Sequence, residues 1–372
     1  MLRLLTAGES HGPALCGIIE GLPAGIEVSA RDIDLQLSRR QAGHGRGARM
    51  RIERDRVQIL SGVRRGRTLG SPVALLIPNK DRRARRPAMT VPRPGHADLA
   101  GAVKYGFSDL ADVLERASAR ETAVRVALAT PCRSLLSGFG VRLSSRVIAI
   151  GGETDRSDPS GLSPERWARL ADASCVRCLD RAAGARMVRA VDAAKAAGDT
   201  LGGVFEVRAW GLPAGLGSHV HWDRRLDGDL SRSLMALNGI KAVEVGAGWA
   251  GAGMPGSAVH DALFWDRKAG GLTRRTNRAG GLEGGITNGM TLVLRAAMKP
   301  PASLAEPLPS VDLRTRKPAP APAVRSDVCA VPAAAVVAES LAALELADAF
   351  LLKFGGDSMA ETRSHYDASF DS

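Results

Sequence analysis

The chain has 372 residues, and its 51 Lys and Arg against 39 Asp and Glu give a formal net charge of +12 at pH 7. A hydrophobic fraction of 45% and a charged fraction of 24% are those of a globular protein, so a largely disordered chain is excluded. The surplus of positive charge predicts an anionic partner, without saying which one.

The 42 glycines, 20 prolines and 4% aromatic residues favour turns and close backbone approaches over a helical bundle, so we expect mixed α and β structure. The apolar stretch at the N-terminus is too short for a signal peptide. Five cysteines do not make the even set of a secreted disulfide framework. A cytoplasmic protein with reduced thiols is therefore expected.

In chain order, residues 14–29 contain apolar runs on both sides of a glycine-proline turn, which predicts a strand, a turn and a second strand. Residues 39–49 are basic and rich in glycine, which indicates a loop. Residues 67–80 and 286–299 share a pattern of glycine turn, apolar run and lysine, which hints at an internal duplication.

Ser118 and Glu121 fit a capping box at the start of a helix, which Pro131 should kink or end. Residues 333–352 are the longest apolar segment, but acidic side chains within it make a membrane span costly. We expect a packed helix that stops at Gly355. The sequence PAPAP at 318–322 is the most linker-like stretch, yet no clean boundary is visible, so a single domain over residues 1–372 is favoured.

Three local patterns suggest other chemistry. Residues 246–251 match the dinucleotide fingerprint, but a poor helix start follows and no alternating strands and helices surround it. The sequence His219-Val-His221-Trp-Asp223 could place metal ligands on one strand face, but no supporting cluster exists, and surface or core histidines are favoured. Residues 175–178 form a single CxxC without a second pair, which favours ordinary reduced cysteines.

Basic runs such as residues 82–86 could bind nucleic acid. No nucleic-acid-binding motif accompanies them, and only 7 Phe and 2 Tyr are available for base stacking. A pocket for an anionic small molecule explains the same arginines. A basic nucleic-acid-binding protein is the first alternative, and a nicotinamide-dependent dehydrogenase built on residues 246–251 is the second.

A series of short motifs occurs in one order along the chain. The motifs are Gly8-Glu-Ser-His-Gly12, the arginine-glycine loop at 39–49, Arg93-Pro-Gly-His-Ala-Asp98, Arg116-Ala-Ser-Ala-Arg-Glu-Thr122, Gly284-Gly-Ile-Thr-Asn-Gly289 and Arg325-Ser-Asp327. Each is weak alone, but in this order they resemble chorismate synthases over essentially the whole chain. The resemblance implies an α+β fold, a single-domain β-α-β sandwich that assembles as a homotetramer.

Chorismate synthases are lyases of the shikimate pathway to the aromatic amino acids. They remove phosphate and a ring proton from 5-enolpyruvylshikimate 3-phosphate in an anti-1,4-elimination that gives chorismate, and they require reduced FMN without net redox change. The substrate and the flavin are both anionic, so a closed pocket must supply positive charges and N–H groups. By resemblance Arg40, Arg46 and Arg49 hold the substrate. In some relatives this region is also linked to NADP, so whether NADPH reduces the flavin stays open.

The resemblance also assigns catalytic roles. His11 resembles the acid that helps phosphate to leave, and His96 the group that protonates or hydrogen-bonds the reduced flavin. Histidine suits both roles because it can give and take a proton near neutral pH. Asp327 resembles the carboxylate that relays the proton from flavin N5, and a salt bridge with Arg325 is its alternative interpretation.

The remaining predicted contacts are with the flavin, part of which would sit on N–H groups at the start of the helix that Ser118 caps. They are Arg116, Ala117, Ser118, Asn238, Gly239, Gly284, Lys299, Pro300, Pro301, Ala302, Ser303 and Arg325. No metal, nucleic-acid or membrane partner is expected. The chain departs from the family pattern at Ala117, where many relatives have serine, at Pro131, and in the shortened, arginine-rich segment 82–90.

Overall fold

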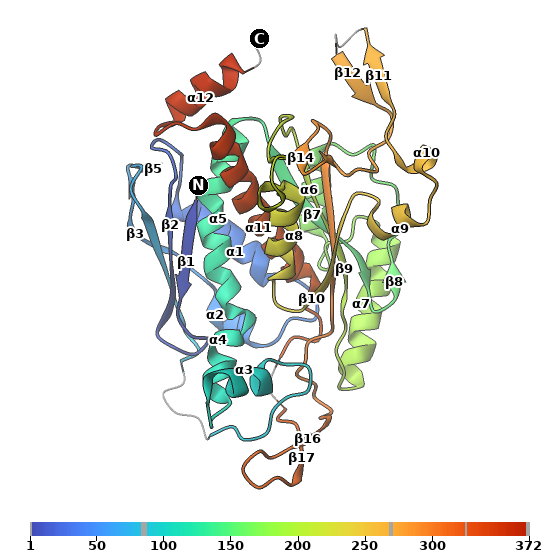
Figure 1. Cartoon of the computed structure of the whole chain (residues 1–372). Coiled ribbons are helices and arrows are strands. Elements are labelled where there is room, and N and C mark those ends of the chain that lie inside the picture. Colours follow the sequence, from blue (N-terminus) through green and yellow to red (C-terminus); the bar gives the residue numbers. More distant parts are fainter. Residues whose placement is uncertain (1, 83–87, 268–270, 324–325, 370–372) are drawn as a thin grey trace.

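Two antiparallel sheets enclose a layer of helices in the computed structural model, which describes residues 2–82, 88–267, 271–323 and 326–369 (Figure 1). The first sheet has the strand order β1 (Arg3–Ala7), β2 (Ala14–Glu20), β6 (Val73–Pro78) and β3 (Gln58–Ser61). The second has the order β10 (Ile240–Val245), β15 (Leu292–Met298), β9 (Gly203–Trp210), β7 (Arg142–Ile150) and β8 (Glu153–Thr154). The fold is therefore an α+β sandwich of sheet, helices and sheet.

Alternation of side chains along the strands turns one face of the first sheet to the helices. In β2, Leu15 and Ile19 are fully buried while Cys16 and Ile18 are exposed. The first, third and fifth residues of β6 are likewise buried. Because successive side chains of a strand point to opposite faces, this pattern predicts one face in the core and one outside.

The middle layer is built around α11 (Val331–Phe354), which packs against α5 (Thr122–Gly138), α1 (Ala30–Gln41), α8 (Leu226–Met235) and the second sheet. Nearly every side chain of α11 is buried, as expected for a helix that is apolar on all sides. The predicted helix at 333–352 is confirmed, and its C-cap Gly355 has a φ of 62°. Among the described residues, no helix combines the length and apolar character needed to cross a bilayer.

The hint of internal duplication has a counterpart in the topology. In each sheet the first two main strands are neighbours, a helix follows (α1 or α8), and the fourth main strand, β6 or β15, inserts between the second and the third. A short hairpin precedes each inserted strand, formed by β4 (Val63–Arg64) with β5 (Arg67–Thr68) and by β13 (Leu282–Glu283) with β14 (Ile286–Thr287). The two halves meet where α5 packs on α11.

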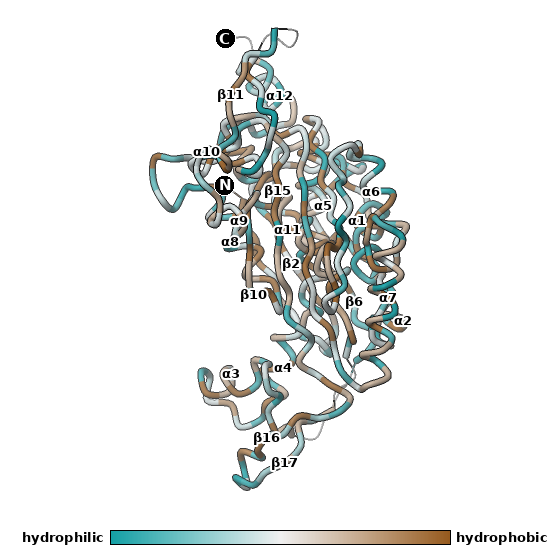
Figure 2. Tube along the Cα trace, turned by 90° about the vertical axis from the view of Figure 1, so that its right-hand side faces the viewer, coloured by the Kyte–Doolittle hydropathy of each residue, from teal (hydrophilic) through white to brown (hydrophobic). Residues whose placement is uncertain are grey.

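One end of the molecule carries a small group of helices and a hairpin beneath the sandwich (Figure 2). It contains α3 (Asp98–Tyr105), α4 (Ala111–Ala117) and the hairpin of β16 (Pro309–Val311) and β17 (Pro318–Pro320).

The other elements of the described residues are α2 (Arg49–Glu53), the 3-10 turns η1 (Ala119–Glu121) and η2 (Trp222–Arg224), α6 (Pro164–Ala173), α7 (Arg181–Ala196), α9 (Gly248–Ala252), α10 (Gly256–Val259), β11 (Leu263–Asp266), β12 (Gly271–Arg274) and α12 (Met359–Ala368).

Several sequence predictions of local structure are wrong. No second strand follows the turn after β2, where only isolated bridges occur at Ala24 and Glu27. The basic segment 39–49 is a loop only at 42–48, because its two ends belong to α1 and α2. The linker-like prolines at 318–320 form β17, which lies at the edge of a two-stranded hairpin, where proline is tolerated. Pro131 does not end α5, which continues to Gly138 because packing on α11 and the sheets outweighs the loss of one backbone hydrogen bond.

The dinucleotide-binding alternative is contradicted by the structure. Residues 246–251 follow β10, which lies in an antiparallel sheet, and lead into a helix of only 5 residues. A Rossmann site needs a parallel βαβ unit with a full helix whose N-terminus faces the pyrophosphate. In the nearby metal-like pattern, His221 pairs with Asp223 on the surface.

All five cysteines are described and are unpaired thiols, as predicted. Burial raises the pKa of the Cys178 thiol to about 12, which makes it unreactive. The main hydrophobic core runs through both sheets and the helices between them, and a small separate cluster of Ala102, Leu110 and Val113 lies at α3 and α4. This continuity supports the single-domain organisation, which stays a prediction.

Candidate active site

The turn between β1 and β2 carries His11 and depends on a glycine. Gly8 has a φ of +105°, and a Cβ atom there would lie 2.4 Å from the carbonyl oxygen of Ala14, so no other residue fits. The turn rests on the last part of α4, where the Ser10 N–H donates to the Glu115 carbonyl oxygen at 2.9 Å. His11 contacts the Glu115 carboxylate, and its side chain is only 10% exposed.

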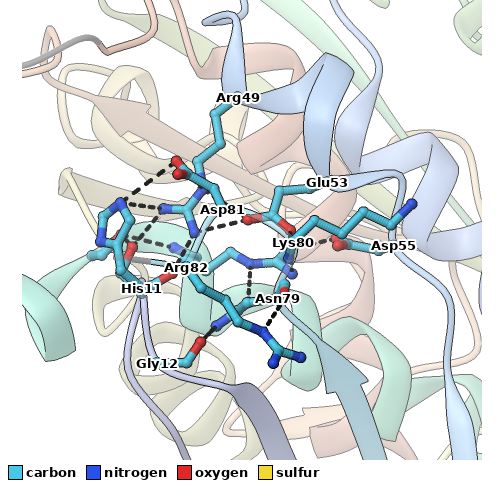
Figure 3. Close-up of polar contacts among 12 residues, drawn as sticks. His11, Gly12, Arg49, Glu53, Asp55, Asn79, Lys80, Asp81 and Arg82 are labelled. Carbon is cyan, nitrogen blue, oxygen red and sulfur yellow. Dashed lines mark hydrogen bonds and ion pairs between the residues drawn. The ribbon is translucent and has the colours of Figure 1, made fainter. Parts of the chain in front are cut away.

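On its other side, the His11 ring faces an arginine and a carboxylate (Figure 3). Arg49 Nη1 lies 3.4 Å from His11 Nε2, and Asp81 Oδ2 lies 3.8 Å from the same atom. Arg49 also donates to Ser10 Oγ at 2.6 Å and pairs with Glu53 one helical turn away. His11 Nε2 therefore lies at a charged site, where it could exchange a proton with a bound anion.

Arg40, Arg46 and Arg120 form a second group of arginines, in which the first and last are buried and the Arg46 side chain is 10% exposed. Arg40 is 4% exposed and donates to Thr122 Oγ1 and to the Ala119 carbonyl oxygen, both at 2.9 Å. Arg120 is also 4% exposed and donates to Asp55 at 2.6 Å. Arg46, at the end of the arginine-glycine loop, pairs with Asp327 and interacts electrostatically with Arg40.

Each of these three guanidinium groups keeps one buried N–H without a hydrogen-bond partner among the described residues. The nitrogens are Arg40 Nη1, Arg46 Nε and Arg120 Nη2. Burial lowers the pKa of Arg40 to about 9, and the neighbouring charges of Arg46 and Arg120 add to the lowering against the opposing effect of Asp55. Arg120 Nη2 has only an ion-pair contact of 3.5 Å with Glu53, and Arg40 Nη1 has one of 3.9 Å with Asp55. Buried donors without hydrogen bonds that also repel one another are costly, and a bound oxyanion relieves both costs.

Asp327 precedes α11 and faces the same loop. Its Oδ2 lies 2.8 Å from Arg46 Nη1, and its Oδ1 accepts a 2.7 Å hydrogen bond from the Gly47 N–H. A Cβ atom on Gly47 would lie 3.1 Å from the Ser326 carbonyl oxygen, so the glycine permits this approach. Arg46 thus forms a salt bridge that the sequence did not predict, while Arg325, the predicted alternative partner, lies outside the described residues.

A second cluster surrounds His96. Its Nδ1 lies 2.5 Å from Oδ1 of the fully buried Asp98. Arg93 donates to both oxygens of that carboxylate at 2.8 and 2.9 Å, and to Ser303 Oγ at 2.9 Å. Although burial alone would raise it, the hydrogen bonds from His96 and Arg93 hold the pKa of Asp98 well below its usual range. A groove of about 420 Å³ opens beside His96, between the loop that carries it and the start of β16.

The two clusters are joined by a chain of hydrogen bonds. The Ala117 carbonyl oxygen, at the end of α4, accepts from Asn238 Nδ2 at 3.1 Å. The carbonyl oxygen of the next residue, Gly239, accepts from the Lys299 N–H at 2.9 Å. Lys299 Nζ then donates to the Gly95 carbonyl oxygen at 2.6 Å, next to His96. Residues from four distant segments are thus brought together.

The predicted capping box at Ser118 is wrong. Ser118 Oγ accepts from the Arg120 N–H and heads the three-residue turn η1, while Glu121 accepts from Thr6 Oγ1 rather than reaching back. The full helix α5 starts only at Thr122. Ser118 also accepts a 3.1 Å hydrogen bond from Ser10, so it lies beside the His11 turn. Arg116 extends over the same turn and donates to the Gly8 carbonyl oxygen.

The other predicted flavin contacts divide into two groups. Pro300, Pro301 and Ala302 lie with Ser303 in the loop after β15, where the Pro301 carbonyl oxygen accepts from Thr200. Gly284 lies in the hairpin before β15, and the length of that strand separates it from Lys299 by about 20 Å. Within one chain, therefore, Gly284 is not brought to the other residues. Arg325 lies outside the described residues.

Sequence reasoning missed several partners of the site residues. Glu115 and Arg120 lie within or beside a quoted motif but were given no role, and Arg93 and Asp98 were quoted only as neighbours of His96. Glu53 was also missed, although its spacing from Arg49 is that of an i,i+4 helical pair. Glu115, which is distant from His11 in the sequence, could be found only once the fold had placed it.

Comparisons with known proteins identify the family. The model of the family described as chorismate synthase matches residues 2–351. Curated chorismate synthases from Geobacter metallireducens and Moorella thermoacetica are 52% and 56% identical, covering 100% and 96% of this chain and 99% and 95% of their own. A crystal structure of chorismate synthase superposes with a TM-score of 0.83 at 40% identity, covering 100% of this chain and 97% of that one. The chain therefore belongs to the chorismate synthase family.

Proposed function

We propose that the cluster around His11 binds 5-enolpyruvylshikimate 3-phosphate beside reduced FMN and eliminates phosphate from it to form chorismate. Family membership makes the chain a lyase of the shikimate pathway. The observation that carries the proposal is the set of three buried guanidinium nitrogens without a hydrogen bond, in Arg40, Arg46 and Arg120. Such a set suits a phosphate and a carboxylate.

Arg40, Arg46 and Arg49 then bind the substrate, and Arg120 joins them because its Nη2 is also buried without a hydrogen bond. His11 donates a proton to the leaving phosphate from the ring nitrogen that faces Arg49. Asp327 relays the proton that leaves the substrate ring, and its contacts with Arg46 and the Gly47 N–H hold its carboxylate in place.

The residues around Lys299 fit the proposed flavin. Burial, with help from the nearby charge of Lys241, lowers the pKa of the Lys299 ammonium, so an anion such as the flavin phosphate would be stabilised there. Asn238, the Ala117 backbone and the loop up to Ser303 line the same region. Reduced FMN, when bound, supplies electron density to the substrate ring as phosphate leaves. His96 holds a proton toward the flavin, and Asp98 fixes the His96 ring.

The experiment that tests this function is anaerobic incubation of the whole protein with 5-enolpyruvylshikimate 3-phosphate, with and without reduced FMN. Phosphate release that requires the flavin is expected. Release without flavin, or no release, contradicts the proposal. Tight, salt-sensitive binding of random duplex DNA in a parallel assay would favour the nucleic-acid alternative instead.

Replacing Arg40 with glutamine is expected to raise the KM for the substrate by about 10- to 100-fold, because a charged hydrogen bond to a buried oxyanion is lost. Arg31→Gln, on the exposed side of the same helix, is the matched control and should leave KM unchanged. Steady-state kinetics of both variants, with thermal unfolding as a check on folding, measure the effect. A KM for Arg40→Gln within twofold of the wild-type value would contradict the assignment.

Replacing His96 with alanine is expected to weaken FMN binding by about tenfold, the size of one lost hydrogen bond. The change also leaves the buried Asp98 carboxylate without its imidazole partner. Fluorescence titration of FMN gives the dissociation constant directly. An unchanged constant together with a slowed reaction would move His96 from flavin binding to the chemical step.

We further propose a cytoplasmic homotetramer. The five unpaired thiols agree with a reducing compartment. Leu5 and Ile18, paired across β1 and β2, are 69% and 43% exposed, and apolar surface of this kind is typical of a subunit contact. Light scattering should give four times the chain mass of 39.0 kDa. Adding NADPH in place of chemically reduced flavin decides whether the protein reduces FMN itself.

A further inference from the structure

Glu115 holds His11 at two points of its side chain. Its Oε1 lies 2.8 Å from His11 Nδ1, and its Oε2 accepts the His11 backbone N–H at 2.7 Å. The backbone carbonyl oxygen of Glu115 accepts from the preceding residue of the same turn, Ser10. One residue of α4 therefore fixes both the backbone and the ring of His11.

The contact with Nδ1 determines which ring nitrogen carries a proton. An ionised carboxylate only accepts hydrogen bonds, so Nδ1 must be the donor in this pair. The other nitrogen, Nε2, is then the atom whose protonation can change, and it faces Arg49 and Asp81. In other enzymes an acidic residue behind an imidazole sets the tautomer in the same way.

We propose that Glu115 is a positioning residue for His11, which keeps a proton on Nδ1 and reserves Nε2 for exchange with the leaving phosphate. The second half of this statement rests on the proposed function, whereas the tautomer does not. The side chain of Glu115 is 22% exposed, and its place in the last turn of α4 would also allow a merely structural tie between helix and turn.

Glutamine distinguishes these two roles because it has the shape of glutamate but only one acceptor oxygen. If that oxygen keeps the His11 N–H, the amide NH₂ group faces Nδ1 and donates to it, which moves the imidazole proton to Nε2. A structural contact between helix and turn would survive Glu115→Gln, whereas the imidazole proton would move from Nδ1 to Nε2.

The direct measurement is the tautomer of His11 by ¹⁵N NMR of the full chain with labelled histidine, the signal being identified by its loss in His11→Gln. Wild-type protein should have the proton on Nδ1, and Glu115→Gln should have it on Nε2. With substrate and reduced FMN, kcat of Glu115→Gln should fall by about 100-fold, the lower range for loss of acid-base catalysis, with KM within twofold of wild type. Asp112→Asn, which removes an exposed carboxylate from the same helix, is the control and should change neither.

The outcomes separate this proposal from the proposed function. If wild-type protein releases no phosphate, the function fails while the NMR result still decides the tautomer. If Glu115→Gln keeps its proton on Nδ1, or turns over within twofold of wild type, the positioning role is wrong. If glutamine prevents folding, the wild-type spectrum decides alone, because a proton on Nε2 with Nδ1 bare would overturn the proposal.

Discussion

Replacing His11 with alanine is expected to slow phosphate release by about 10²- to 10⁴-fold, the range for loss of a positioned general acid. The ring lies between Glu115 and the pair of Arg49 and Asp81, so its removal takes away the proposed proton donor beside Arg49. The dissociation constant of FMN should stay within about twofold of wild type, because a group that does not touch the flavin adds nothing to its binding.

Rapid-quench measurement of phosphate, with a parallel FMN titration, separates these two effects. His260→Ala is the matched control, since that histidine is exposed and follows the short helix α10. It should leave both quantities unchanged. Should His11→Ala turn over at the wild-type rate, the family would stand and the role of His11 as acid would be withdrawn.

Replacing Glu339 with alanine is expected to lower the free energy of unfolding by about 3–5 kcal/mol, the cost of breaking a buried ion pair. Glu339 is fully buried in α11 and holds three arginines from other elements. They are Arg39 at 2.9 Å, Arg133 at 3.1 Å and Arg177 at 3.2 Å. Without the carboxylate, three cations, one buried and two partly buried, repel one another at this position.

Glu345 provides the comparison because it lies on the same helix but is partly exposed, 3.8 Å from Arg232. Its replacement by alanine should cost less than about 1 kcal/mol, as for other exposed pairs. Urea unfolding of the two variants measures both changes. Equal losses would show that the Glu339 cluster contributes no more than a surface pair.

The same carboxylate predicts how stability depends on pH. Burial alone would raise the pKa of Glu339, but the charges of Arg39, Arg133 and Arg177 lower it to about 2. A lowered pKa means that the folded state binds this proton less readily than the unfolded state. The stabilisation is therefore complete above about pH 4.5 and is lost as the pH falls toward 2. Glu339→Gln should flatten this part of the stability curve.

Sequence patterns correctly predicted elements whose surroundings are of one kind on every side, such as a fully buried helix. The apolar segment 333–352 is buried on all sides, so its composition alone identified a packed helix. Pro131 was misjudged because the packing of α5 against α11 and both sheets is a tertiary effect that local propensity does not contain. For the same reason, the sequence showed Glu339 only as an acidic residue that makes membrane insertion costly. The three arginines that pair with it come from separate parts of the chain.

In the candidate site, too, contacts between distant parts of the chain could not be predicted from local sequence. Motifs pointed to His11 and Arg49, and the fold places Arg49 Nη1 3.4 Å from His11 Nε2. The residues that orient them, such as Glu115, are far away in the sequence and carry no local signal. Gly284 illustrates the opposite case, because its motif is clear but the single chain leaves it at the far end of β15.

The most direct test of the proposed elimination is the number of chorismate molecules formed for each molecule of reduced FMN under strictly anaerobic conditions, with no other reductant present. We predict that phosphate and chorismate appear in equal amounts, that many turnovers occur per flavin, and that the flavin remains reduced at the end. Product limited to one molecule per flavin, or flavin oxidised in step with product, would contradict an elimination without net redox change.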